Sequence, residues 1–235
     1  NNCGNSYKAK KQKPRRESGA IRYSMSRTTH GLDEGLHNYI KQRFVHETEA
    51  LAGLRAATSQ QPGAQMQIAP EQGQFMMMLA RLIGARHAIE IGTFTGYSTL
   101  WLAHGLQSGC YDRGRIITCD IDDQMPAIGR PFWQKDRLDH LIDLRVAPAL
   151  ETLNHLLDSD KEHGAYDLIF IDADKASYQA YFDRGCNLLR TGGLVLIDNT
   201  LWGGNIIDDS KVDNATQAIR AFNDQLSIDS RFEVS

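Results

Sequence analysis

Four acidic residues stand at or near the ends of apolar runs in this chain: Glu90, Asp120, Asp172 and Asp198. If each run is a strand of one parallel sheet, the carboxyl ends of the strands meet at a single edge, where open α/β sheets bind ligands. One acid after a strand is unremarkable, because Asp caps helices and begins turns. Four acids at one edge favour a ligand-binding site over four unrelated caps.

Asp172, Asp198 and Asn199 could together hold a metal ion. Two carboxylates and an amide carbonyl are the hard oxygen donors that Mg²⁺, Mn²⁺ or Ca²⁺ selects, and no His or Cys accompanies them as zinc would require. Three protein ligands leave about half of an octahedral shell for water or a substrate. The alternative is a turn at Asp198-Asn199 and a helix cap at Asp172.

Two further residues could act on a substrate. Lys175 lies three residues after Asp172, and a lysine near a cation loses its proton readily enough to serve as a general base. The alternative is a structural salt bridge to Asp172 or Asp174. Trp202 begins a glycine-containing loop that could wall a flat substrate, although core packing of this ring is equally compatible with the sequence.

The stretch from Ala88 to Ser98 reads as a strand, a tight glycine turn and the start of a helix. Such a turn lets the backbone approach a ligand, and the helix start supplies free N–H donors. The glycines Gly92 and Gly96 are spaced GxxxG, not G-x-G-x-x-G as in dinucleotide sites, and Glu90 would repel a pyrophosphate. The pattern favours an adenosyl ligand without phosphates, with Asp120 on its ribose hydroxyls.

Five apolar runs alternate with helical stretches and should position these residues. The expected strands are 88–91, 115–120, 141–146, 167–172 and 194–198, and Gly192-Gly193 is expected to form the turn before the last. The expected helices are two within 32–59, then one from 69 or 70, 99–106, 123–136, 148–158, 175–189 and 213–226. Strands too apolar for a wet face predict a parallel sheet covered on both sides. In the helix that begins near Pro70, the run Met76 to Met78 is expected to pack in the core.

The composition bounds the remaining possibilities. With 235 residues, 41% of them hydrophobic, one α/β domain is expected over 31–235, after a flexible basic tail at 1–30. A net charge of -3 gives no pull toward nucleic acid or an anionic membrane, and we expect neither as a partner. Four cysteines without a C-x-x-C pair favour a reducing cytoplasm. No signal peptide or membrane span is expected.

Four segments give the chain a resemblance to a known family: Met66–Phe75, Glu90–Ser98, Asp172–Lys175 and Asp198–Trp202. From about residue 32 onward the chain resembles the cation-dependent O-methyltransferases that use S-adenosylmethionine. That group includes caffeoyl-CoA and catechol O-methyltransferases and many small bacterial relatives. The resemblance implies a Rossmann-like class I methyltransferase fold, with a mostly parallel sheet and N-terminal helices that help cover the substrate.

The resemblance also implies a role for each matching residue. The S-adenosylmethionine pocket would be lined by Ile68, Glu90, Gly92, Thr93, Ser98, Asp120, Ala149 and Asp174. The divalent cation, most readily Mg²⁺, would be held by Asp172, Asp198 and Asn199. Lys175 would be the catalytic base, and Asp172 would also lie beside the substrate oxygen. The implied methyl acceptor is a small aromatic hydroxyl compound such as a catechol, and the implied assembly is a homodimer.

Four features depart from the family pattern. Ala147 stands where relatives often have Gly and could narrow the adenine pocket. The segment 107–114 is longer than expected and is interpreted as a surface loop. Gly203 stands where plant enzymes can carry an amide that touches substrate, which disfavours a CoA thioester. The chain also stops at Ser235, before the final antiparallel strand that relatives carry, so the last hairpin is expected to be incomplete.

Two other functions are alternatives to methyl transfer. A nicotinamide-dependent oxidoreductase could use a similar sheet, but the missing G-x-G-x-x-G and the acid at Glu90 disfavour it. A non-catalytic S-adenosylmethionine-binding protein would keep the fold without the chemistry. The presence of Asp172, Lys175, Asp198 and Asn199 argues against this second alternative.

Overall fold

The structure is a computed structural model that describes residues 33–107 and 114–235. Its five strands are β1 (His87–Ile91), β2 (Arg115–Asp120), β3 (Ile142–Val146), β4 (Tyr166–Ile171) and β5 (Leu189–Ile197). They form one sheet in the order β3-β2-β1-β4-β5, and every pair is parallel. The predicted parallel sheet is confirmed. The predicted tail at 1–30 and the loop residues 108–113 lie outside the described residues.

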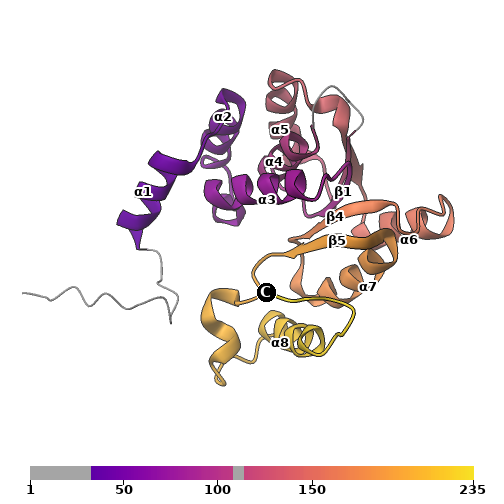
Figure 1. Cartoon of the computed structure of the whole chain (residues 1–235). Helices are drawn as coiled ribbons and strands as arrows, with labels where there is room; N and C mark the ends of the chain where they lie inside the picture. Colours follow the sequence, from indigo (N-terminus) through magenta and orange to yellow (C-terminus); the bar gives the residue numbers. More distant parts are fainter. Residues whose placement is uncertain (1–32, 108–113) are drawn as a thin grey trace, which may run out of the picture.

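Helices cover both faces of the sheet, as Figure 1 shows. One face packs against α2 (Glu49–Thr58), α3 (Pro70–Leu82), α4 (Tyr97–Leu106) and α5 (Gln124–Lys135). The other packs against α6 (Ala149–Asp158), α7 (Tyr178–Leu188) and α8 (Asn214–Ser227). Alternate residues of each strand serve the two faces: in β1, Ala88 enters the first core while Ile89 and Ile91 enter the second. This is why the interior strands β1, β2 and β4 are mainly apolar, whereas the edge strand β3 carries Asp143 and Arg145.

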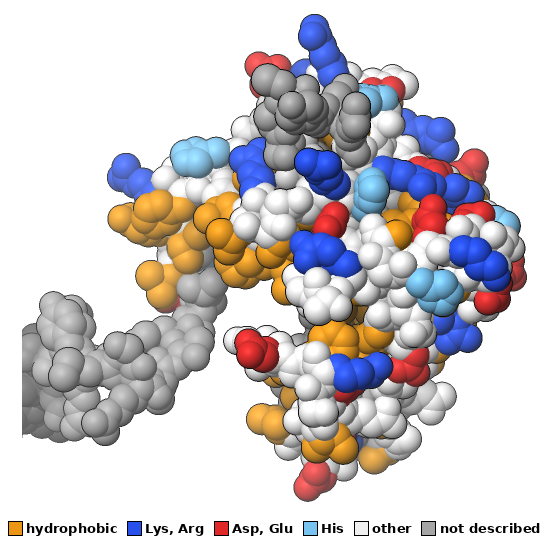
Figure 2. Space-filling model, turned by 45° about the vertical axis from the view of Figure 1, so that its right-hand side comes forward, with side chains coloured by type: hydrophobic (Ala, Val, Ile, Leu, Met, Phe, Trp, Pro, Cys, Tyr) orange, Lys and Arg blue, Asp and Glu red, His pale blue; other side chains and the backbone are white. Residues whose placement is uncertain are grey.

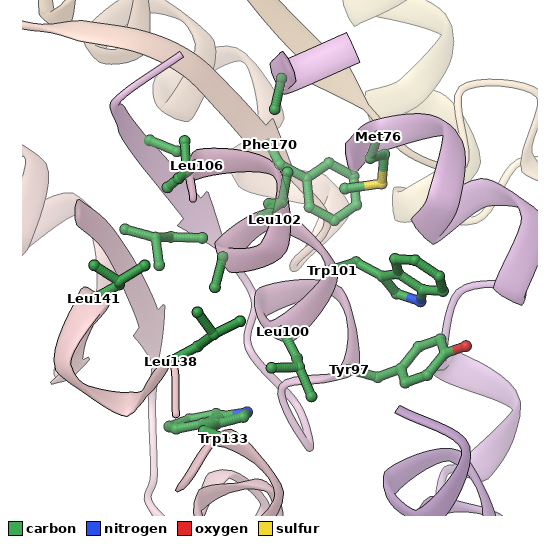
Figure 3. Packing of buried hydrophobic residues seen from close by; sticks show 14 of the residues in the cluster. Met76, Tyr97, Leu100, Trp101, Leu102, Leu106, Trp133, Leu138, Leu141 and Phe170 are labelled. Atoms are coloured by element: carbon green, nitrogen blue, oxygen red, sulfur yellow. The ribbon is translucent and has the colours of Figure 1, made fainter. Parts of the chain in front are cut away.

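The first core is organised around Trp101 of α4, which is 1% exposed. Figure 3 shows its indole between Tyr97 and Met76, and the Tyr97 ring meets it edge-on with centroids 6.3 Å apart. A Cβ on Gly73 would lie 2.2 Å from the Trp101 ring. Gly73 therefore allows α3 to approach α4 closely, and the two helices pack together on the same face of the sheet.

The methionine run of α3 corrects a sequence expectation. Met76 is buried in the core, but Met78 is 54% exposed, and Phe75 and Leu82 are exposed as well. Helical spacing shows that apolar residues share a face but not which face meets the sheet. In the structure the inward face carries Gly73, Met76 and Ala80, so the second apolar face points outward.

The boundary of β5 also differs from expectation. The strand begins at Leu189, and the predicted turn at Gly192-Gly193 lies within it, with Gly192 at φ 74°. Pairing with β4 passes from Tyr166–Leu189 to Leu168–Leu194, so the intervening residues form an irregularity in β5. The glycines interrupt the ladder without ending the strand, because Gly tolerates the left-handed region.

The two predicted N-terminal helices are present, and they differ in burial. Thr48 caps α2, which buries Ala50, Leu51 and Leu54 in the first core. By contrast, α1 (Glu34–Phe44) buries none of its residues, although it lies against α3. Short 3-10 turns complete the described chain: η1 (Ala64–Met66), η2 (Asp139–Leu141), η3 (Lys175–Ser177) and η4 (Trp202–Ile207). Across residues 33–107 and 114–235, no helix has both the length and the apolar character that a membrane span needs.

Candidate active site

A pocket of about 970 Å³ opens at the carboxyl ends of the strands. It lies where the strand order reverses between β1 and β4, the switch point at which open α/β sheets bind ligands. All the predicted site residues except Glu90 line it: Ile68, Gly92, Thr93, Ser98, Asp120, Ala149, Asp172, Asp174, Lys175, Asp198 and Asn199. One cavity therefore contains both the glycine turn and the cluster of oxygen donors.

The glycine turn between β1 and α4 is braced by Asp120. Gly92 and Gly96 have φ values of 100° and 75°, which Gly adopts without a Cβ penalty. The backbone N–H of Phe94 donates to Oδ2 of Asp120 at 2.8 Å, and the N–H of Ile121 donates to Oδ1 at 2.7 Å. Oδ1 also accepts from the N–H of Asp122 at 3.4 Å, whereas Oδ2 can accept a further hydrogen bond, so Asp120 remains able to bind a ligand hydroxyl.

Glu90 lies beneath the pocket instead of lining it. The side chain is fully buried, and its Oε2 accepts hydrogen bonds from the hydroxyls of Thr99 and Thr118. Its other oxygen, Oε1, has no hydrogen-bond partner among the described residues. Burial raises the pKa of Glu90 to about 7, although the nearby hydroxyls of Ser98, Thr99 and Thr118 favour the charged form and oppose the shift. The carboxyl can therefore reach a ligand only through an intermediary such as Ser98, which does line the pocket.

The predicted metal ligands stand together at the ends of β4 and β5. Burial raises the pKa of Asp172, the Lys175 ammonium opposes the shift, and the nearby Asp198 carboxylate adds to it. Asn199 has φ 59°, and its backbone N–H donates to Oδ1 of Asp198 at 2.6 Å. The described residues contain no cluster of three or more His, Cys, Asp or Glu side chains that could hold a metal. The set here has two carboxylates and an amide, a donor chemistry that fits a hard divalent cation.

Lys175 is held at the edge of this cluster by three neighbours. Its Nζ donates to Oδ1 of Asp172 at 3.2 Å and to the hydroxyl of Tyr178 at 2.5 Å. Nζ also lies 5.6 Å from the ring centroid of Trp202, which lines the pocket. Burial raises the pKa of Tyr178 well above its ordinary value, so this hydroxyl keeps its proton. In the structure Lys175 forms the salt bridge to Asp172 and also reaches the pocket.

Several pocket residues were not predicted from the sequence. The Tyr181 hydroxyl donates to Oδ1 of Asp174 at 2.5 Å, and Phe94, Ile121 and Met125 add apolar wall. Ile121 directly follows Asp120, so an apolar residue after a predicted site acid was the available signal in the sequence. Tyr181 gave no such signal, because its place on α7 looks like ordinary helix packing.

Comparison with known proteins agrees with this geometry. An O-methyltransferase family model matches residues 41–235. A catechol O-methyltransferase domain-containing protein of Mus musculus is 38% identical over 203 residues, covering 86% of this chain and 76% of that protein. A caffeoyl-CoA O-methyltransferase of Medicago sativa is 36% identical over 209 residues, covering 86% of this chain and 83% of that enzyme.

Solved structures extend the comparison to the cofactor. An O-methyltransferase from Streptomyces achromogenes, in complex with S-adenosylmethionine, superposes with a TM-score of 0.73 at 30% identity, covering 82% of this chain and 84% of that one. An O-methyltransferase from Bacillus cereus, in complex with S-adenosylhomocysteine, gives 0.73 at 31% identity, covering 83% and 86%. The chain therefore belongs to the family of S-adenosylmethionine-dependent O-methyltransferases.

Proposed function

We propose that this enzyme transfers the methyl group of S-adenosylmethionine to a hydroxyl of a catechol-like or other small aromatic compound, with help from a divalent cation. The observation that carries the proposal is the shared pocket, in which the turn at Gly92 faces the donors Asp172, Asp198 and Asn199. A methyl donor on the turn and an acceptor oxygen at the donors would then be neighbours. The family assignment leaves no support for the nicotinamide-dependent alternative.

Each predicted site residue has a proposed task in this reaction. Ile68, Gly92, Thr93, Ser98, Ala149 and Asp174 shape the methyl donor's site, Asp120 accepts from its ribose hydroxyls, and Glu90 supports the floor through Ser98. When bound at Asp172, Asp198 and Asn199, a divalent cation would act as a Lewis acid that lowers the pKa of the acceptor hydroxyl. Lys175 also lines the pocket, and its proposed task is to receive that hydroxyl's proton.

The proposed step moves one methyl group and one proton. The bond between sulfur and methyl carbon breaks, a bond between that carbon and the acceptor oxygen forms, and the acceptor proton passes to Lys175. The sulfonium loses its positive charge and the lysine gains one. Holding the two reactants in one pocket supplies most of the acceleration, because positioning converts a bimolecular encounter into a unimolecular step.

The relatives' names supply the acceptors to test, namely catechol and caffeoyl-CoA. The purified enzyme should methylate at least one of them, lose turnover in excess chelator and regain it with Mg²⁺, Mn²⁺ or Ca²⁺. Asp172→Ala and Asp198→Ala should lose activity, while Asp158→Ala, at the exposed end of α6, should keep it. Full activity in excess chelator would refute the role of the cation. Unchanged activity in both site variants would mean that the site is misplaced.

We also propose that two copies associate through an apolar surface on the N-terminal helices. This surface consists of Leu36, Tyr39 and Phe44 of α1 and Phe75, Met78 and Leu82 of α3, all of them exposed. Figure 2 shows hydrophobic side chains gathered over this part of the molecule. A helix such as α1 that buries none of its residues has little to stabilise it alone, and contiguous apolar patches often mark interfaces. A cytoplasmic location is proposed from the thiols of Cys119 and Cys186, which form no disulfide within residues 33–107 and 114–235.

A further inference from the structure

A buried tyrosine lies directly behind Lys175. Tyr178 is the first residue of α7 and has no exposed surface. Its hydroxyl accepts a hydrogen bond from Nζ of Lys175 at 2.5 Å and donates to the backbone carbonyl of Asp198 at 3.2 Å. One hydroxyl therefore connects Lys175, which follows β4, with Asp198, which follows β5.

The ring of Tyr178 is held by Phe222 and lies beside Lys175. Phe222 of α8 meets it edge-on, with ring centroids 6.0 Å apart and planes at 88°. Nζ of Lys175 lies 4.7 Å from the centroid of the same ring, within the range of a cation–π interaction. A lysine has a flexible four-carbon stem, so a rigid neighbour is needed to give its nitrogen a defined position.

The direction of these hydrogen bonds decides how the amine is oriented. The phenol proton of Tyr178 goes to the Asp198 carbonyl, so an oxygen lone pair faces Lys175 and can accept only from its N–H. Oδ1 of Asp172 accepts a second N–H, at 3.2 Å. These two contacts engage two of the three positions around Nζ, so the third position is fixed as well. The third position carries a proton in the ammonium and the lone pair after that proton has left, and it is where the proton of the acceptor would be received.

We propose that Tyr178 is a positioning residue for methyl transfer, whose hydroxyl orients Nζ of Lys175 toward the acceptor and ties it to the end of β5. The inference rests on the proposed function, in which Lys175 takes the proton of the acceptor. Tyr178 itself does not line the pocket, so it acts through Lys175 and not on the substrate.

The first test compares two buried tyrosines. Tyr178→Phe should lower kcat roughly tenfold or more, the effect of losing a hydrogen bond to a charged group. KM for S-adenosylmethionine and for the best acceptor of catechol and caffeoyl-CoA should stay within about twofold, because neither contacts this hydroxyl. Tyr166→Phe is the matched control: Tyr166 is 2% exposed, and its hydroxyl donates to Glu162 at the opposite end of β4. It should leave kcat unchanged.

The second test is a double-mutant cycle with Lys175→Ala, in which residual product is measured by mass spectrometry. If Tyr178 acts through Lys175, Tyr178→Phe should cause no further loss in the Lys175→Ala background. Equal losses in both backgrounds, or an unchanged kcat in Tyr178→Phe alone, would overturn the inference and leave the proposed function intact. An unchanged kcat in Lys175→Ala would instead refute the role of Lys175 in the proposed function.

Calorimetric binding of S-adenosylhomocysteine reports whether Tyr178→Phe still has a formed pocket. Phe fills the same space as Tyr, so binding should be within about twofold of the parent enzyme. Loss of this binding would assign the hydroxyl to folding instead of orientation, and would also overturn the inference.

Discussion

Gly92 and Asp172 lie backbone to backbone: a Cβ atom on Gly92 would be 2.0 Å from the carbonyl oxygen of Asp172. The contact continues the pairing of β1 with β4, in which the N–H of Asp172 donates to the carbonyl of Ile91 at 2.9 Å. It brings the glycine turn and the acidic donors to the same pocket. Space for one extra carbon does not exist at this point, so the turn and the donors can be this close only with glycine.

Gly92→Ala should therefore damage both the fold and the pocket. A left-handed φ costs a residue with a Cβ roughly 1–2 kcal/mol, and the clash with Asp172 adds to this, giving an expected total above about 3 kcal/mol. Denaturant unfolding measures the loss of stability. Calorimetry should show weakened binding of S-adenosylhomocysteine, because the turn must move away from β4.

Gly84 provides the control for this substitution. It also has a positive φ, 64°, but a Cβ there would meet nothing within 4 Å. Gly84→Ala should cost only the conformational part, about 1–2 kcal/mol, and leave ligand binding unchanged. If the two variants lose equal stability and both bind normally, the close approach of Gly92 to Asp172 is not important.

The buried Glu90 predicts a pH-dependent stability. Burial raises its pKa to about 7 in the folded protein, from 4.5 when unfolded, so the folded state holds a proton that the unfolded state has released between these values. Stability depends on the difference in bound protons, so the contribution of Glu90 should fall as pH rises from 4.5 toward 7 and then level off. Below pH 4.5 both states are protonated and Glu90 costs nothing.

Glu90→Gln should remove this dependence. The free energy of unfolding of the variant minus that of the parent, measured in the absence of ligand, should rise from pH 5 to pH 7 and then stay constant. The test is how this difference changes with pH and not its size at one pH. Gln brings an amide N–H to the unpartnered position of Oε1, and this changes the stability by the same amount at every pH. A difference that is flat from pH 5 to pH 8 would show that Glu90 ionises normally in the folded enzyme.

The sheet was predictable because parallel strands with both faces covered are mainly apolar. The predicted strand Arg115–Asp120 is β2 without change. Three of the four acids, Asp120, Asp172 and Asp198, line one pocket as expected, whereas Glu90 lies within β1 and beneath the pocket. The glycines of β5 were misread as a turn because Gly192 does leave the strand conformation, while pairing resumes at Leu194. The outward face of α3 was misassigned because its periodicity does not reveal which side the sheet occupies.

The site was predictable in its residues but not in its supports. Carboxylates and glycines carry a chemical signature in the sequence, whereas the Tyr178 hydroxyl contacts Asp198, which is distant along the chain. The pKa of Glu90 depends on burial under the turn, where Thr99 and Thr118 supply its only hydrogen bonds to Oε2 among the described residues. Spacing along the chain cannot show such burial.

Arg220 of α8 holds the backbone of the segment 205–211, and we predict that the order of this segment affects acceptor binding. Its guanidinium donates four hydrogen bonds, at 2.6–2.9 Å, to backbone carbonyls of the segment 205–211, which follows Trp202. An ammonium cannot reach all four, so Arg220→Lys should lower the free energy of unfolding by about 1–2 kcal/mol. It should also raise the acceptor KM, because Trp202 lines the pocket, and expose the segment to protease.

Arg231→Lys is the control for the arginine substitution. Arg231 pairs with Asp229 beyond the end of α8, and its side chain is 60% exposed. This variant should keep the acceptor KM and the protease pattern of the parent. If Arg220→Lys is cut by protease no faster than Arg231→Lys and keeps the acceptor KM of the parent, the hydrogen bonds from Arg220 to the segment 205–211 do not affect the pocket.

The apolar surface on α1 and α3 predicts a dimer that a single charge can split. A two-fold interface presents the same patch from both copies, so an Asp introduced into it meets an apolar partner surface and approaches its own symmetry mate. Leu82→Asp should shift the enzyme from a dimer to a 26.3 kDa monomer in light scattering coupled to size-exclusion chromatography.

Ile228→Asp is the matched control, because Ile228 is 82% exposed and Leu82 is 81% exposed. Ile228 lies after α8, which packs on the other face of the sheet. The control should remain dimeric. A monomeric parent enzyme, or a Leu82→Asp variant that dimerises like the control, would show that this surface does not join two copies.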